Sequence, residues 1–318
     1  MPPRRVIGID AGGTNLRGGV IDQDLVVHHR VHRQWRGSDR EETLDIMVGA
    51  VEEVRAVASD VAAVGFGLPA LVEWETGVAR WSTHLPLVDV PFRDMMSERL
   101  GLPVYVDNDA NLAMLAEHRS GAARGARHAV LVALGTGIGS GLLLDGRLYR
   151  GAGGLGAEIG HMVVDIDGPE CQGACPGRGC LEVLASGTAI GVAGEAAARR
   201  EPESALGKRL AGGGGISGGL VTELAHDGDK LARSVLAEIG RRLGAGLTGV
   251  VNVFNPQVVV VGGGVLAAGE LLLGPAREVV AERALPPARD QAEIVPARFG
   301  EESGMLGAAL LAFEEGVV

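Results

Sequence analysis

Hydrophobic and polar positions along the first part of the chain follow short strand-like runs and one longer helical pattern. The β-rich runs at residues 4–10 and 16–21 flank the turn AGGTN, which predicts a hairpin, and a third strand is expected at 25–32. A helix is expected at 41–58, and the apolar run at 62–70 predicts a buried strand that ends at a Gly/Pro turn. The opening segment is therefore predicted to mix strands and helices.

The next segment continues this mixture. Residues 72–91 are expected to form short strands and loops, followed by a helix at 92–100 and a strand at 103–107. A further helix is predicted at 108–122, because apolar residues recur there at helical spacing and Asn108 is a residue type that caps helices.

The opening pattern returns in the middle of the chain, where HAVLVAL, GTGIG and SGLLLDGRL again give strand, glycine turn and strand. We interpret this as a weak internal duplication that predicts two lobes. The small lobe is expected at 1–120, with a C-terminal helix at about 301–318 packing back on it, and the large lobe at 121–300. A long helix is predicted at 230–254, and the glycine-rich stretch at 211–220 is predicted to be a loop.

Composition and charge narrow the class of protein. The 318 residues include 51 glycines, only 3% aromatics and a formal net charge of −11. This charge argues against nucleic-acid partners, which select for clustered Lys and Arg. The N-terminus lacks a signal-peptide pattern and no run of about 18 apolar residues occurs, so we expect a cytoplasmic protein without a membrane partner.

Three glycine turns follow predicted strands: DAGGTN at 10–15, GTGIG at 135–139 and GGG at 262–264. Glycine allows backbone N–H groups to approach an anion, and the first two turns each add a threonine hydroxyl. Neither is a P-loop or a Rossmann turn, because strands rather than helices follow them. Each turn alone is also typical of an ordinary hairpin. Together with Asp10, which can hold Mg²⁺ through water, they suggest a nucleotide clamped between two lobes.

Three groups of polar residues are candidates for chemistry. Asp109, in VDNDAN, follows a strand and opens a helix, where it can cap backbone N–H groups or accept a proton from a substrate hydroxyl. Glu158 and His161 stand one helical turn apart among glycines, which favours a close-approach site over an exposed helix face. Glu182 is either a third polar group of that site or an ordinary acid at a helix N-terminus.

All three cysteines of the chain lie in the stretch 161–180. His161, Cys171, Cys175 and Cys180 supply the Cys₃His set that is standard for tetrahedral zinc, and the intervening glycines and proline supply the turns. Inert buried thiols would instead be scattered over strands and helices. We therefore predict a structural Zn²⁺, because four protein ligands leave no open position for water.

Over almost its whole length the chain resembles the ROK family of sugar kinases and repressors. The resemblance rests on GIDAGGTN, VDNDAN, GTGIGSG, GAEIGHM, GCLEVLASG and VVVVGGGV. It implies an α/β, two-lobed actin-like ATPase (ribonuclease H-like) fold with an active-site cleft between the lobes. It also implies ATP-dependent phosphorylation of a hexose at the 6-hydroxyl, with ATP, Mg²⁺ and structural Zn²⁺, in a homodimer or homotetramer.

The resemblance further implies roles for individual residues. Asp109 matches the general base that takes the proton of the sugar hydroxyl. The positions that match sugar contacts are Gly67, Thr83, Asn108, Glu158, His161 and Glu182. The positions that match ATP contacts are Asp10, Gly12, Gly13, Thr14, Thr136 and Gly137 for the phosphates, and Gly263 and Gly264 for adenosine.

Three positions depart from the family pattern. The family loop usually reads CxCGxxGC, whereas QGA separates Cys171 from Cys175 here, so Cys171 is the zinc ligand in question. Ala70 replaces the usual glycine of the GLPA turn. His84 stands where many glucokinases of the family have Asn, and the preceding Thr83 is similar to the hexosamine-kinase-like members.

These departures leave the sugar open between two classes. Glucose is the expected substrate, and N-acetylmannosamine or N-acetylglucosamine is the alternative. A third hypothesis is a non-catalytic, sugar-sensing ROK protein. It is disfavoured because the family's repressors carry a winged helix-turn-helix ahead of the kinase-like part, whereas the GIDAGGTN motif here begins within ten residues of the start.

Overall fold

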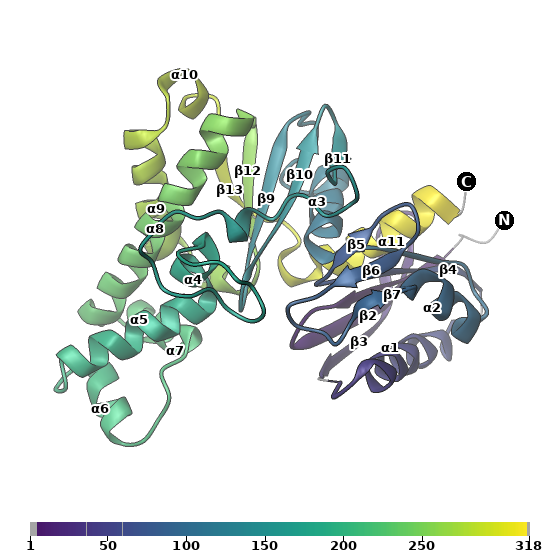
Figure 1. Cartoon of the computed structure of the whole chain (residues 1–318), viewed down its shortest axis with the longest axis horizontal. Helices are drawn as coiled ribbons and strands as arrows, with labels where there is room; N and C mark the ends of the chain where they lie inside the picture. Colours follow the sequence, from purple (N-terminus) through teal and green to yellow (C-terminus); the bar gives the residue numbers. More distant parts are fainter. Residues whose placement is uncertain (1–4, 36, 59, 317–318) are drawn as a thin grey trace. The chain divides into compact units, whose positions relative to one another are not determined.

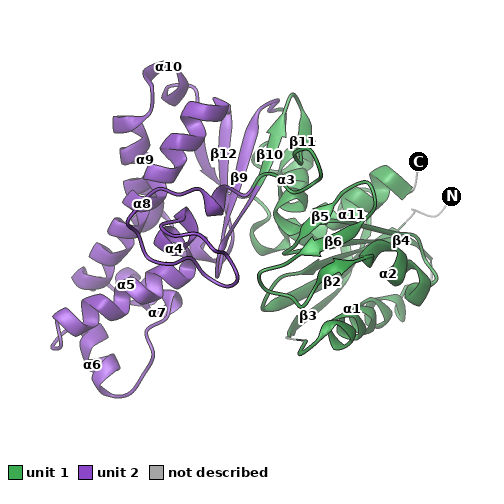
Figure 2. Cartoon of the chain, in the orientation of Figure 1, with its two compact units in different colours: residues 1–125, 141–157, 298–318 green, residues 126–140, 158–297 purple. Residues whose placement is uncertain are grey.

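The computed structural model describes residues 5–35, 37–58 and 60–316 (Figure 1). The chain forms two compact units, which Figure 2 distinguishes by colour. Unit 1 comprises residues 1–125, 141–157 and 298–318, and unit 2 comprises residues 126–140 and 158–297. Unit 1 thus adds residues 141–157 to the small lobe expected from the sequence. Among the described residues, no helix is both long and apolar enough to cross a membrane.

The main sheet of unit 1 has five strands in the order β3-β2-β1-β4-β8. Their bounds are β1 Arg5–Ala11, β2 Asn15–Asp22, β3 Val27–Gln34, β4 Val61–Leu68 and β8 Val104–Asn108. β1 and β2 form the predicted antiparallel hairpin, whereas β1, β4 and β8 run parallel. In this register Asp10 lies opposite Gly67, and Leu68 opposite Asn108. The carboxyl ends of three parallel strands therefore bring several candidate site residues to one edge of the sheet.

Helices cover both faces of this sheet. They are α1 Arg40–Arg55, α2 Phe92–Leu100, α3 Asp109–Ser120, η3 Gly300–Glu302 and α11 Ser303–Gly316, and a small second sheet contains β5 Leu71–Glu73, β6 Val78–Trp81 and β7 Val88–Val90. Ile7 and Ile9 of β1 pack in one core with α1, whereas Val6 points to the opposite face and packs with α11. A Cβ on Gly65 would lie 1.9 Å from the Ala308 carbonyl oxygen, so only glycine lets α11 approach β4 this closely.

The second five-stranded sheet has the order β11-β10-β9-β12-β13. Its strands are β9 Ala129–Leu134, β10 Ile138–Leu144, β11 Arg147–Tyr149, β12 Val258–Gly262 and β13 Glu293–Pro296. The helices of unit 2 are η1 Ile159–His161, α4 Leu181–Ala185, α5 Gly187–Arg200, α6 Ala205–Ala211, α7 Gly218–His226, α8 Lys230–Phe254, η2 Gly264–Ala268, α9 Glu270–Arg283 and α10 Pro286–Arg289. β12 runs parallel to β9 and β13, and α8 packs against α7 and α9.

Two segments differ from the sequence-based expectation. The loop predicted at 211–220 is shorter, because Ser217 accepts a hydrogen bond from the Leu220 amide and α7 begins at Gly218. The third strand is shifted two residues toward the C-terminus, since its register is set by antiparallel pairing of Asn15 with Gln34. The helix at 230–254 has the predicted bounds, and Asn108 caps α3 as predicted.

Candidate active site and metal centre

Two carboxylates lie close enough to interact in unit 1. Asp10 lies one residue before the end of β1, and Asp109 is the first residue of α3. Burial and, to a smaller extent, the negative charge of Asp109 raise the pKa of Asp10 to about 7, and Arg17 opposes this shift. The pKa of Asp109 is also raised, chiefly by burial. Because the ionised form of both carboxylates is disfavoured, this part of unit 1 favours the binding of a proton or of a cation between them.

The backbone around Asp109 is fixed by Asn108. The side-chain oxygen of Asn108 accepts hydrogen bonds from the amides of Ala110 (3.0 Å) and Asn111 (3.2 Å), and its Nδ2 donates to the Ala70 carbonyl (3.3 Å). Oδ1 of Asp109 also accepts from the Ala110 amide (2.8 Å), whereas its Oδ2 accepts no hydrogen bond from another residue in the described part of the chain. One oxygen of Asp109 thus caps the helix, and the second is available for chemistry.

A buried ion pair between Asp107 and Arg150 stabilises the segment that leads into Asp109. Asp107 is only 1% exposed, and its Oδ2 accepts a hydrogen bond from Nε of Arg150 (2.6 Å). Asn111 donates to the other oxygen of Asp107 (3.1 Å), and the Arg150 guanidinium lies 3.9 Å from the ring centroid of Trp74. This pair could not be predicted from the sequence, although Asp107 belongs to the VDNDAN motif, because Arg150 carries no local signal of its own.

The first glycine turn, at residues 12–14, lies between β1 and β2. Trp35 anchors it: the indole N–H donates to the Gly12 carbonyl (2.9 Å), and the Trp35 amide donates to the Thr14 carbonyl (3.1 Å). A Cβ on Gly13 would lie 3.0 Å from Cβ of His84, so a side chain at this position would crowd His84. The turn is therefore held through its carbonyls.

His84 connects this turn electrostatically to Asp109. It is exposed, and its charge lowers the pKa of Asp109 against the larger effect of burial. Thr83 beside it is partly exposed. Gly67, at the end of β4, faces Asp109 closely enough that a Cβ there would lie 3.3 Å from the Asp109 Cα. Unit 1 therefore brings together Asp10, Gly13, Gly67, Asp109 and His84, of which His84 was singled out from the sequence only as a departure.

The second glycine turn, in unit 2, is built around Glu182. This residue lies on α4, is 5% exposed, and accepts a hydrogen bond at Oε2 from the Ile138 amide (2.8 Å). A Cβ on Gly137 would lie only 2.2 Å from the same oxygen. The Thr136 carbonyl accepts a hydrogen bond from the Thr188 hydroxyl (2.8 Å). The turn is therefore tied to the helices that follow it in the chain.

The third glycine turn lies at the same edge of unit 2. Gly262 ends β12 opposite Ala133 of the parallel strand β9, so residues 263–264 lie close to the second turn. Gly263 has φ +84°, and a Cβ there would lie 2.3 Å from the Leu134 carbonyl oxygen. Both the backbone conformation and the space at this position require glycine.

The predicted metal ligands come together in unit 2. The donor atoms of His161, Cys171, Cys175 and Cys180 all lie within 4.8 Å of one another. Cys171 belongs to this group despite the QGA insertion, because Gly173 turns the chain with φ +61° and the Cys171 amide donates to the Gly177 carbonyl (2.9 Å). Burial and the neighbouring thiols raise the pKa of Cys171.

Glu158 and Glu182 lie beside these four residues. Glu158 precedes the single 3₁₀ turn that carries His161, and its carbonyl accepts the His161 amide (3.0 Å). Oε1 of Glu182 lies 3.9 Å from Sγ of Cys171. Glu182 therefore touches both the cysteine cluster and, through Ile138, the second glycine turn.

Comparisons with known proteins show which family the chain resembles. A family model described as "ROK family" matches residues 6–315. The glucokinase of Thermotoga maritima is 35% identical over 312 residues, which cover 97% of each chain. The crystal structure of a ROK family glucokinase from Streptomyces griseus in complex with glucose and AMPPNP has a TM-score of 0.89 and 34% identity, covering 98% of this chain and 99% of that one.

A regulator of the same family is also similar. A ROK family transcriptional regulator, described as a homolog of the E. coli MLC protein, has a TM-score of 0.87 and 28% identity, covering 98% of this chain and 78% of that one. The two sheets and these neighbours define the actin-like α/β class, so the predicted fold class is confirmed. Within that class the chain belongs to the ROK family.

Proposed function

We propose that this protein transfers the γ-phosphoryl group of ATP to the 6-hydroxyl of a hexose, and that glucose is its main substrate. One observation carries the proposal: Asp109 stands with a raised pKa and one free carboxylate oxygen at the carboxyl edge of the unit 1 sheet. This occurs in a chain that is 34% identical, over 98% of its length, to a ROK glucokinase solved with glucose and an ATP analogue.

Asp109 acts as the general base in this proposal. Its carboxylate accepts the proton of the attacking hydroxyl, and a raised pKa makes it a better proton acceptor once ionised. Phosphoryl transfer depends mainly on positioning and charge stabilisation, so the residues that hold Asp109 still matter as much as the base itself. The residues proposed to position the sugar are Gly67, Thr83, Asn108, Glu158, His161 and Glu182.

The glycine turns of the two units are proposed to contact ATP. In unit 1, Asp10, Gly12, Gly13 and Thr14 serve the phosphates, and in unit 2, Thr136 and Gly137 do so. Gly263 and Gly264 serve adenosine. Asp10 is the residue that would hold Mg²⁺, and the raised pKa of Asp10 next to Asp109 fits a cation that relieves their repulsion. Mg²⁺ neutralises charge on the phosphates when it is bound.

A structural Zn²⁺ is proposed at His161, Cys171, Cys175 and Cys180. The convergence of one imidazole and three sulfur donors fits the tetrahedral Cys₃His set. With zinc bound, these side chains fix the loop between η1 and α4, and Cys171 fixes its contact with Glu182. We also propose that the protein works in the cytoplasm, where its three thiols stay reduced and available to the metal.

An ATP-consumption assay across glucose, mannose, fructose, N-acetylglucosamine and N-acetylmannosamine tests the proposed activity. Glucose is expected to give the highest kcat/KM. The hexosamines are the alternative class, because Thr83 is similar to the hexosamine-kinase-like members and His84 stands where many glucokinases of the family have Asn. Turnover with a hexosamine alone would move the assignment to that class. Absence of sugar-dependent ATP consumption would refute the kinase assignment.

A further inference from the structure

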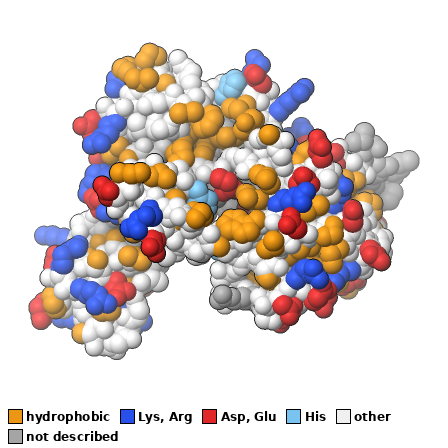
Figure 3. Space-filling model, in the orientation of Figure 1, with side chains coloured by type: hydrophobic (Ala, Val, Ile, Leu, Met, Phe, Trp, Pro, Cys, Tyr) orange, Lys and Arg blue, Asp and Glu red, His pale blue; other side chains and the backbone are white. Residues whose placement is uncertain are grey.

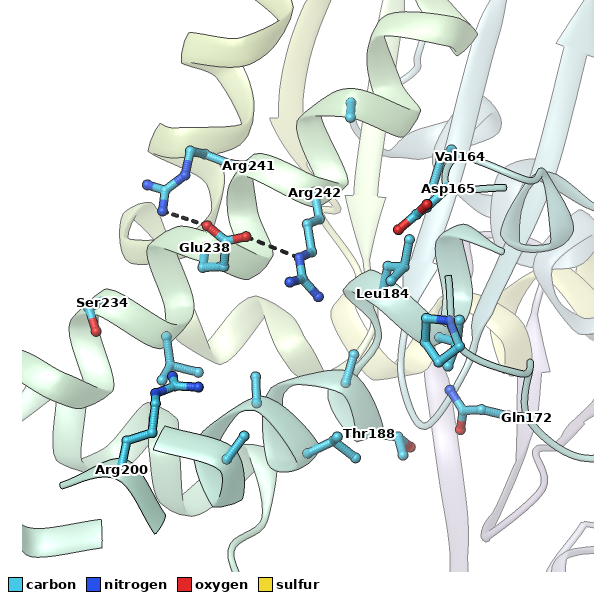
Figure 4. A pocket seen from close by; sticks show the side chains of 18 residues that line it. Val164, Asp165, Gln172, Leu184, Thr188, Arg200, Ser234, Glu238, Arg241 and Arg242 are labelled. Atoms are coloured by element: carbon cyan, nitrogen blue, oxygen red, sulfur yellow. Dashed lines mark hydrogen bonds and ion pairs between the residues drawn. The ribbon is translucent and has the colours of Figure 1, made fainter. Parts of the chain in front are cut away.

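Most ion pairs in the described part of the chain are exposed, and Figure 3 shows charged side chains spread over the face of the molecule that it draws. Figure 4 shows one such group beside a groove of unit 2, where Glu238 pairs with Arg241 and Arg242 and the three side chains are 45% to 54% exposed. Exposed pairs of this kind contribute little to stability. The pair of Arg150 with Asp107 differs, because the side chain of Asp107 is 1% exposed and that of Arg150 is 18% exposed.

Arg150 contacts three segments of unit 1 that are far apart in the sequence. Its Nε donates to Oδ2 of Asp107 in β8 (2.6 Å), and its guanidinium lies 3.9 Å from the ring centroid of Trp74, the residue after β5. Its carbonyl oxygen accepts a hydrogen bond from the Gly156 amide (2.8 Å). This last bond closes residues 150–156 into a loop, which we call the glycine loop because four of its seven residues are glycine.

The Asp107 carboxylate orders the turn that carries Asp109. Its Oδ1 accepts hydrogen bonds from the Asn108 amide (2.7 Å) and from Nδ2 of Asn111 (3.1 Å), which are the residues just before Asp109 and in the first turn of α3. Both oxygens of Asp107 are therefore in use, one for Arg150 and one for the turn. A shift of Arg150 reaches Asp109 through these hydrogen bonds.

The glycine loop packs on the small sheet and leads to Glu158. A Cβ on Gly154 would lie 2.4 Å from the Val72 carbonyl oxygen, so the loop lies directly against β5. Ala157, the next residue after the loop, has φ +69°, a conformation that residues other than glycine rarely adopt and that the surrounding contacts must maintain. Because Glu158 follows at once, the conformation of the loop sets the backbone direction at Glu158.

We propose that Arg150 is a positioning residue of the kinase reaction, which holds the turn of Asp109 and the glycine loop that leads to Glu158 in one fixed arrangement. The inference rests on the proposed function, in which Asp109 is the base and Glu158 contacts the sugar. A buried ion pair is in itself a poor source of stability, because the loss of hydration offsets the attraction. This pair instead fixes the distance between two segments of the site, and displacing a reacting group by about 1 Å can lower a rate by about 10²-fold.

A pair of variants separates positioning from stability. Arg150→Met leaves the buried charge of Asp107 unpaired, so a lower melting temperature is expected. The double variant Asp107→Asn/Arg150→Met has no unpaired charge, and asparagine still accepts the Asn108 amide, so it is expected to recover most of that loss. Arg147→Met, at an exposed arginine of the same strand β11, is the matched control and is expected to resemble the wild type.

Steady-state kinetics with glucose and ATP then tests the proposal. In the double variant, kcat is expected to remain ~10–100-fold below wild type and KM for glucose to rise several-fold, while KM for ATP stays within ~2-fold. Recovery of kcat together with stability would overturn the proposal, because it would show that Arg150 acts only on stability. An equal rise in both KM values would contradict a role confined to the base and the sugar.

Hydrogen exchange measured by mass spectrometry tests the link between the two segments without any substrate. In the double variant the amides of residues 107–111 and 151–157 are expected to exchange at least ~10-fold faster than in the wild type, whereas those of α1 keep their rates. Faster exchange in one segment alone, or in neither, would overturn the proposal even in an active enzyme. An inactive wild-type protein would refute the proposed function, and hydrogen exchange would still decide whether Arg150 joins the two segments.

Discussion

Asp10→Asn is expected to stabilise the ligand-free protein at alkaline pH. The pKa of Asp10 is raised from 3.8 to about 7, first by burial and then by the charge of Asp109. Its side chain forms no hydrogen bond with the described residues, and asparagine has nearly the same shape, so the variant loses no hydrogen bond. The variant therefore removes an unfavourable, partly buried charge and little else.

The size and sign of the effect follow from the shift in pKa. The folded protein binds the Asp10 proton more tightly than the unfolded chain does, so wild-type stability falls as pH rises from about 4 to about 7. The difference between 3.8 and about 7 is roughly 3 units, or at most ~4 kcal/mol at ~1.4 kcal/mol per unit. Partial exposure of Asp10 reduces this value, so about 2–4 kcal/mol is expected at pH 8, and less than half of it at pH 5.

Chemical denaturation followed by tryptophan fluorescence measures this gain, without Mg²⁺, nucleotide or sugar. The three tryptophans of the chain, Trp35, Trp74 and Trp81, all lie in unit 1, so the signal reports on the unit that contains Asp10. Asp24→Asn, at an exposed carboxyl of the same unit, is the control and is expected to change little. An equal gain at pH 5 and pH 8, or a loss at pH 8, would refute the reasoning about the buried carboxylates.

Two further predictions concern unit 2. Cys175→Ser is expected to lower bound zinc, measured by plasma emission spectrometry, well below one per chain and to lower the melting temperature; unchanged metal content would contradict the proposed ligand set. Gly137→Ala is expected to reduce kcat/KM because its Cβ would lie 2.2 Å from a Glu182 oxygen, whereas Gly135→Ala, which meets nothing within 4 Å, is expected to be far milder. Equal effects of the two alanines would show that the contact with Glu182 is irrelevant.

Features encoded in consecutive residues were predictable from the sequence. The long helix α8 has the expected bounds because its apolar face repeats over many turns, and Asn108 caps α3 because capping depends on the next few residues. The cysteine cluster was predictable for the same reason, since its ligands lie within one short stretch. The short helix α7 was missed because two glycines open it and hide its helical pattern.

Contacts between distant residues could not be predicted in this way. Asp107 and Arg150 are 43 residues apart, and Glu182 and Ile138 are 44 apart, so no local pattern pairs them. The interaction of His84 with Asp109 likewise depends on how the small sheet folds back toward α3. The sequence indicated which side chains are candidates for the site. Their pKa values, and the distant residues that hold them in place, depend on the packing of the folded chain.

Asp109→Asn tests the proposed kinase mechanism most directly. Asparagine keeps the size of the side chain and can still accept the Ala110 amide at its carbonyl oxygen, but it cannot take a proton from the sugar. With glucose and ATP, kcat is expected to fall by roughly 10²–10⁴-fold while KM for glucose stays within a few-fold of wild type. A variant that is folded, binds glucose and turns over at nearly the wild-type rate would contradict the assignment of Asp109 as the general base.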